Sequence, residues 1–140
     1  MRYVRLSIVI CIILSSLLNV SGCKKHEDQD KNGGYKYVGF YLRTDTADFF
    51  IADGDSGFFT DKEFIRIRPV EESWDPNADR VSFDSLNNGD KIDIEIETVG
   101  DLYPRVTQVY RYNLLEQGDI SYIDESVIAT LDEMGYKVVQ

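Results

Sequence analysis

The stretch Lys91–Glu97 reads KIDIEIE, and it decides the fold class of this 140-residue chain. Isoleucine alternates with a charged residue at every step. Because successive side chains of a β-strand point to opposite faces, a strand with this pattern has one apolar face and one solvated face. The period of two predicts a half-buried β-strand rather than a helix.

Strand signals continue on both sides of this stretch. The further predicted strands are Tyr35–Arg43, Ala47–Ala52, Phe64–Arg68 and Arg105–Tyr112, with Val81–Phe83 as a short additional one. In the first of them, Val38, Phe40 and Leu42 share one face, and Tyr37 and Tyr41 share the other.

A helix is predicted only near the C-terminus, over Asp124–Met134. Asp124 or Ser121 can cap its start, and Gly135 can end it. Its apolar face consists of Val127, Ile128, Leu131 and Met134. Five to seven short strands and one C-terminal helix predict a mainly β fold, a small antiparallel barrel, because closing a sheet removes its exposed edges. An open α+β sheet with the helix on one face is the alternative.

The N-terminus has the features of an export signal. Arg2 and Arg5 precede an apolar, uncharged segment, Leu6–Leu18. This segment is shorter than the roughly 20 residues that span a bilayer, which favours a signal peptide. It is followed by Val20-Ser21-Gly22-Cys23, which resembles the bacterial lipobox. The resemblance implies cleavage between Gly22 and Cys23, with a diacylglyceryl group on the Cys23 sulfur and anchoring to a bacterial membrane.

These signals divide the chain into three parts. Residues 1–22 are predicted to be the signal peptide, residues 23–34 the lipidated cysteine and a polar tether, and residues 35–140 a single β-rich domain. Cys11 and Cys23 are the only cysteines, so the predicted mature domain has no free thiol for catalysis or disulfide formation. Removing residues 1–22 removes two arginines and no acidic residue, which changes the formal net charge from −10 to −12. Such an acidic domain disfavours nucleic-acid binding.

One stretch resembles a family. Ser82–Ile92 reads SFDSLNNGDKI and is followed by Leu102-Tyr103-Pro104. It resembles small bacterial lipoproteins with a YobA-like domain of unknown function, and the likeness extends over about Tyr35 to Tyr112. In place of that family's glutamate and serine before Tyr103, this chain has Gly100-Asp101-Leu102. The resemblance implies an OB-like barrel and an envelope location, and it implies no activity.

Two groups of carboxylates are possible chemical sites. Asp53 and Asp55 have the spacing of calcium ligands, but the loop lacks the other residues of an EF-hand, so a hairpin turn is favoured over a metal site. Asp93, Glu95 and Glu97 form a row on one strand face, as the carboxylates of a glycan hydrolase could. Their alternation with isoleucine predicts a solvated face instead, where a raised acid pKa is not expected.

The aromatic residues offer the other candidate surface. Phe49–Phe50 and Phe58–Phe59 are adjacent pairs, so one ring of each pair is expected in the core and the other outside it or under the helix. Trp74, Tyr41 and Tyr103 are the best candidates for a ligand or partner surface, because Tyr and Trp rings anchor many interfaces. Core and rim packing is the alternative use of these rings.

No nucleotide loop, zinc-ligand cluster or serine-nucleophile motif is present, and no cofactor is expected. The sequence therefore favours a non-enzymatic binding module outside the cytoplasmic membrane, with an envelope protein or a glycan as partner. An envelope glycan hydrolase and a calcium or ligand sensor are the alternatives.

Overall fold

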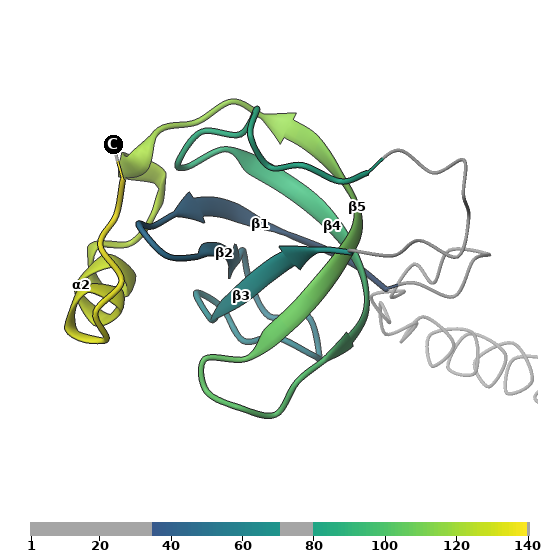
Figure 1. The fold of residues 1–140 in the computed structure, drawn as a ribbon, viewed down its shortest axis with the longest axis horizontal. Coiled ribbons are helices and arrows are strands. Elements are labelled where there is room, and N and C mark those ends of the chain that lie inside the picture. Colours follow the sequence, from purple (N-terminus) through teal and green to yellow (C-terminus); the bar gives the residue numbers. More distant parts are fainter. Residues whose placement is uncertain (1–34, 71–79, 140) are drawn as a thin grey trace, which may run out of the picture.

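The fold is a five-stranded β-barrel with one α-helix against it (Figure 1). The computed structural model describes residues 35–70 and 80–139. Its elements are β1 (Tyr35–Arg43), β2 (Asp48–Ala52), β3 (Phe64–Pro69), β4 (Lys91–Val99), β5 (Val106–Glu116), the 3-10 helix η1 (Ile120–Tyr122) and α2 (Glu125–Glu133). The predicted mainly β class with a C-terminal helix is confirmed. The predicted signal peptide, Cys23 with its tether, and Trp74 lie outside the described residues.

The strands close into a ring in the order β1-β2-β3-β5-β4. Every neighbouring pair is antiparallel except β3 and β5, which run parallel from Arg66 opposite Val106 to Pro69 opposite Val109. The ring has the strand number of OB-type barrels. The predicted barrel is therefore mixed rather than wholly antiparallel, because β5 follows β4 in a hairpin and inserts between β4 and β3.

Two of the predicted strands differ most from the structure. Val81–Phe83 is not a strand, and Phe83 instead packs its buried ring in the barrel interior. Strand β5 continues beyond Tyr112 to Glu116, because Glu116 pairs with Lys91 at the start of β4. Register shifts between β4 and β5 mark bulges, which bend strands as a small ring requires.

Alternating side chains of the strands form two cores. The inner core, inside the barrel, contains Tyr37, Tyr41, Phe50, Ala52, Phe59, Ile65, Ile67, Phe83, Leu86, Ile92, Ile94, Ile96 and Val109. The outer core, between the barrel and α2, contains Leu42, Phe49, Ile51, Phe64, Ile123, Val127 and Leu131. The expectation for the phenylalanine pairs is confirmed: Phe50 and Phe59 are inside, Phe49 is under the helix, and Phe58 is 47% exposed.

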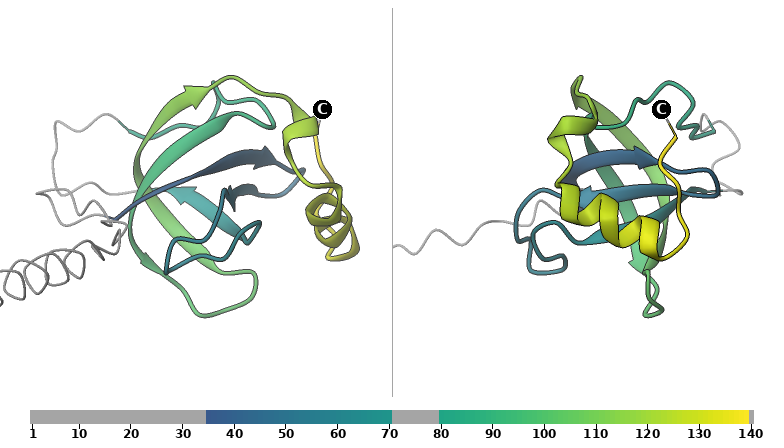
Figure 2. Two further views of the ribbon diagram at one scale, coloured as in Figure 1. Left: turned by 180° about the vertical axis from the view of Figure 1, so that it is seen from behind. Right: turned by 90° about the vertical axis from the view of Figure 1, so that its left-hand side faces the viewer.

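Helix α2 lies across the outside of the barrel (Figure 2). Asp124 caps it by accepting a hydrogen bond from the Ser126 backbone N–H at 2.9 Å, and Gly135 follows it with φ +92°. Residues beyond the helix return to the segment after β1, where Val138 forms an isolated bridge with Thr44. No helix within residues 35–70 and 80–139 has the length and apolar character needed to cross a membrane.

Candidate functional site

The structure corrects one of the predicted surface residues and leaves another exposed. Tyr41 is 0% exposed, because its face of β1 points into the barrel and not to solvent. It therefore belongs to the inner core, and its prediction as a partner-binding ring is wrong. Tyr103 is 72% exposed in the β4–β5 loop, where its ring lies 5.7 Å from the ring of Phe64.

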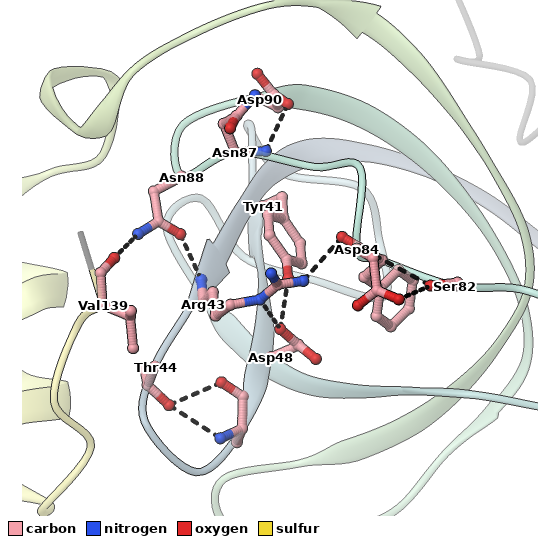
Figure 3. Close-up of polar contacts among 12 residues, drawn as sticks. Tyr41, Arg43, Thr44, Asp48, Ser82, Asp84, Asn87, Asn88, Asp90 and Val139 are labelled. Atoms are coloured by element: carbon pink, nitrogen blue, oxygen red, sulfur yellow. Dashed lines mark hydrogen bonds and ion pairs between the residues drawn. The ribbon is translucent and has the colours of Figure 1, made fainter.

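The Tyr41 hydroxyl belongs to a polar cluster at one end of the barrel (Figure 3). It donates to Asp48 Oδ1 at 2.5 Å, and Arg43 Nε donates to the same oxygen at 3.3 Å. Arg43 Nη2 also donates to the Phe83 carbonyl at 2.8 Å. Burial, reinforced by the hydrogen bond to Asp48, raises the pKa of Tyr41 above its usual range. The cluster thus keeps a protonated phenol and joins the β1–β2 hairpin to the segment before β4.

Further contacts tie the same end together (Figure 3). Asn88 accepts from the Arg43 backbone N–H at 2.6 Å and donates to the Val139 carbonyl at 2.5 Å. Asp90, only 1% exposed, accepts from the backbone N–H groups of Asn87 at 2.8 Å and Gly118 at 3.0 Å. We call this the closed end, formed by residues 41–48, 80–90, 117–119 and 136–139. The Tyr41, Asn88 and Asp90 side chains all bind other parts of the protein, which favours a structural role.

The predicted metal candidates are engaged in the β2–β3 loop. Asp53 Oδ2 lies 2.6 Å from Lys91 Nζ, and the hydrogen bond to Asp53 raises the pKa of Lys91. The Asp55 side chain accepts a hydrogen bond from the Asp61 backbone N–H at 2.9 Å. The Asp61 side chain accepts one from the Gly54 backbone N–H at 2.8 Å. Among the described residues, no group of three or more His, Cys, Asp or Glu side chains is arranged to hold a metal ion. The loop is a hydrogen-bonded turn.

The carboxylate row lies on the outer face of β4. Asp93 accepts from Asn113 Nδ2 at 2.7 Å, and Glu95 pairs in register with Arg111 on β5. The Glu97 side chain lies outside the described part of the chain. Neither Asp93 nor Glu95 lines the groove described next.

A groove of about 700 Å³ lies beside the first turn of α2. It is lined by Phe40, Ile51, Ala52, Asp53, Asp61, Lys62, Ser121, Tyr122, Ile123, Asp124 and Glu125. Three segments meet there: the outer face of β1 and β2, the β2–β3 loop, and η1 with the start of α2. The rings of Phe40 and Tyr122 stand 6.4 Å apart at 68°, and Tyr122 is exposed.

The groove is electrostatically negative. Four carboxylates line it, and Lys62 is the positive side chain among its described lining residues. Lys62 Nζ lies 2.6 Å from Asp124 Oδ2. The hydrogen bond from Lys62, with further bonds from Ser126, holds the pKa of Asp124 well below its usual range, and the same contact raises the pKa of Lys62. Asp124 and Lys62 are therefore both charged at neutral pH and cancel each other, as Asp53 and Lys91 do, so the net negative charge of the groove comes from Asp61 and Glu125.

The position of α2 matters for how this barrel can bind. Here Val127 and Leu131 of α2 pack against Phe49 and Phe64, so the helix covers the outer face of β2 and β3. The groove at the start of α2 is the open part beside that covered face.

The sequence gives no local signal for most groove residues. Lys62 and Asp124 are far apart along the chain, and no periodic pattern links them. Tyr122 lies between the last strand and the helix, where an aromatic residue has no predicted partner. Asp124 is the exception, because its role as a helix cap is predicted from the sequence. The structure shows that the same residue also lines the groove.

Comparisons of the chain with protein-family models, with curated proteins and with solved structures find no match.

Proposed function

We propose that this chain is an exported lipoprotein, anchored through Cys23 outside the cytoplasmic membrane, whose barrel is a non-enzymatic binding module. Its groove takes a cationic segment of an envelope partner. The observation that carries this proposal is the combination of four carboxylates with the Phe40 and Tyr122 rings around one open groove. Opposite charge attracts such a segment, and aromatic faces favour cations.

The contact of Lys91 with Phe40 supports the binding of a cationic group between a carboxylate and an aromatic ring. The Lys91 ammonium lies 5.6 Å from the centre of the Phe40 ring, beside its ion pair with Asp53. The groove thus already holds one amino group between a carboxylate and an aromatic face. A lysine or arginine of a partner would meet the same two kinds of group at Tyr122, Asp61 and Glu125.

The binding test uses the full lipidated chain in detergent micelles and a fluorescent peptide of alternating lysine and glycine. We expect the peptide to bind, with an affinity that falls as salt is added. Tyr122→Ala is expected to weaken binding by about two- to fivefold, since a cation–aromatic contact at an exposed ring contributes about 0.5–1 kcal/mol. Leu115→Ala, which shortens an exposed apolar side chain outside the groove, is the matched control.

Two results would contradict the binding proposal. One is equal binding of a glutamate–glycine peptide, and the other is equal loss of affinity in the Tyr122→Ala and Leu115→Ala variants. Anchoring is tested separately by Cys23→Ala, which should abolish the mass of the diacylglyceryl group and release the chain from membranes. The glycan-hydrolase and calcium-sensor hypotheses, like the YobA-like resemblance, stay predictions: Asp53 lines the groove but is paired with Lys91, and neither Asp93 nor Glu95 lies there.

A further inference from the structure

Three segments far apart in the sequence lie at one end of the barrel. Tyr35, the first residue of β1, pairs with Ile96 near the end of β4, so the β4–β5 loop (100–105) follows beside it. Gly39 pairs with Ala52 at the end of β2, which places the β2–β3 loop (53–63) at the same end. We call this the entry end, because the chain preceding Tyr35 enters the barrel there.

The entry end carries the two most exposed apolar side chains of the described residues. Leu102 is 81% exposed and Tyr103 is 72% exposed. Phe58 of the β2–β3 loop is also exposed, with its ring 6.1 Å from that of Tyr37. The Tyr103 ring contacts Phe64 of β3. Both loops thus hold outward-pointing apolar groups against a packed barrel.

A part-buried ion pair holds this arrangement. Arg105 Nε donates to Glu63 Oε1 at 2.8 Å, and the Arg105 guanidinium lies 5.9 Å from the centre of the Phe58 ring. Burial raises the pKa of the Glu63 carboxyl, but the hydrogen bonds from Arg105 and Thr60 outweigh it and lower that pKa overall. The ion pair neutralises both charges and joins the β2–β3 loop to the β4–β5 loop.

From these positions we infer that the entry end is a lipid-contacting surface. Its Leu102, Tyr103 and Phe58 side chains contact the bilayer that holds the lipidated Cys23. This inference rests on the proposed anchoring. Residues 23–34 precede Tyr35 and can extend over about 40 Å at most. These residues join the domain at Tyr35, so the entry end is the part of the barrel that lies closest along the chain to the lipidated Cys23. Tyrosine is a residue type enriched at the membrane–water interface.

The charges at this end select the kind of lipid. Asp55 and Asp61 of the β2–β3 loop and Asp101 of the β4–β5 loop are exposed. Anionic headgroups would repel them, so a zwitterionic surface fits better. The exposed Leu115, at the far end of β5, lies away from the entry end and provides an internal reference.

The test places a nitroxide spin label on the lipidated full chain in phosphatidylcholine vesicles. The lipidated Cys23 is the only cysteine after residue 22, so Leu102→Cys and Leu115→Cys each provide a unique thiol. We expect the label at 102 to be several-fold more accessible to oxygen than to a water-soluble nickel chelate, and the label at 115 to remain open to the chelate. Adding phosphatidylglycerol should reduce the difference.

The outcomes separate this inference from the proposal on which it rests. Vesicle-bound protein with both labels equally open to the chelate overturns the docking surface and leaves anchoring intact. Shielding of the label at 115 instead of 102 also overturns it. If mass spectrometry finds no lipid on Cys23, the anchoring proposal fails and the docking inference fails with it. Because Leu102 is so exposed, labelling it is compatible with the fold.

Discussion

The closed end and the entry end are built from the same strands, yet their side chains make different contacts. At the closed end, Tyr41, Asn88 and Asp90 direct their polar atoms to other parts of the protein. At the entry end, two loops hold exposed apolar side chains around the ion pair of Arg105 with Glu63. Polar contacts within the protein hold the ring together at the closed end, whereas the entry end presents apolar side chains to its surroundings.

The largest expected effect comes from a matched pair of glycines, one at each end. A Cβ at Gly89 (φ +90°) would lie 1.8 Å from the Asp119 carbonyl oxygen, whereas a Cβ at Gly54 (φ +89°) would meet nothing within 4 Å. We expect Gly89→Ala to lower the free energy of unfolding by about 3–5 kcal/mol and Gly54→Ala by about 1 kcal/mol. Urea denaturation measures both. Equal losses would show that the close approach at the closed end is unimportant.

A smaller effect is expected from Tyr41→Phe. The substitution removes the hydrogen bond to Asp48 and leaves the ring in the inner core, so the loss should be about 1 kcal/mol. Tyr112→Phe is the control, since its hydroxyl donates to the Ser82 carbonyl at 2.9 Å among exposed groups. Thermal or urea unfolding compares the two variants. If Tyr112→Phe lowers the free energy of unfolding as much as Tyr41→Phe does, the polar cluster of the closed end contributes no more to stability than an exposed hydrogen bond.

The smallest effect concerns the contact of Lys62 with Asp124, which joins the β2–β3 loop to α2. The pKa of Asp124 is lowered, so its contribution is present above its unfolded pKa of about 3.9 and is lost as the pH falls through the folded value. The pKa of Lys62 is raised, so its contribution is present below about pH 10.4 and is lost as the pH rises through the folded value. Lys62→Met should reduce both the acid and the alkaline loss of stability. The midpoint of urea unfolding, measured as a function of pH, tests this.

A double-mutant cycle provides the control for this pair. Asp124→Ser keeps a capping hydroxyl at the start of α2 and removes the charge. Combining it with Lys62→Met should give less than the sum of the two single effects on the urea midpoint at neutral pH. Strict additivity would mean that the two charges are not coupled, and the loop would then depend on its backbone hydrogen bonds alone.

Local sequence patterns predicted the strands and the helix. Pairing between distant strands determined their directions and which of their faces became the barrel interior. The alternation over Lys91–Glu97 and the caps at Asp124 and Gly135 were sufficient to predict β4 and α2, because each depends on neighbouring residues. The direction of β5 relative to β3 could not be predicted, since it depends on the pairing of Arg66 with Val106. Tyr41 illustrates the same limit: its alternation on β1 was predicted, but which face would be interior was not.

The groove could not be predicted from the sequence, for a related reason. Phe40, Lys62 and Tyr122 come from a strand, a loop and a 3-10 helix, and only the packing of α2 on the barrel brings them together. No composition or spacing rule links such residues. The charge of the domain was predictable, but its concentration beside two rings was not.

The parallel pairing of β3 with β5 has a consequence for the timing of folding. β5 is the last strand in the chain, and it fills the gap between β3 and β4. A chain that has emerged only as far as Val99 therefore has open edges on both of these strands. When the polypeptide appears N-terminus first, the ring cannot close until residues 106–116 have followed. The order of the strands thus delays completion of the barrel until residues 106–116 have been synthesised.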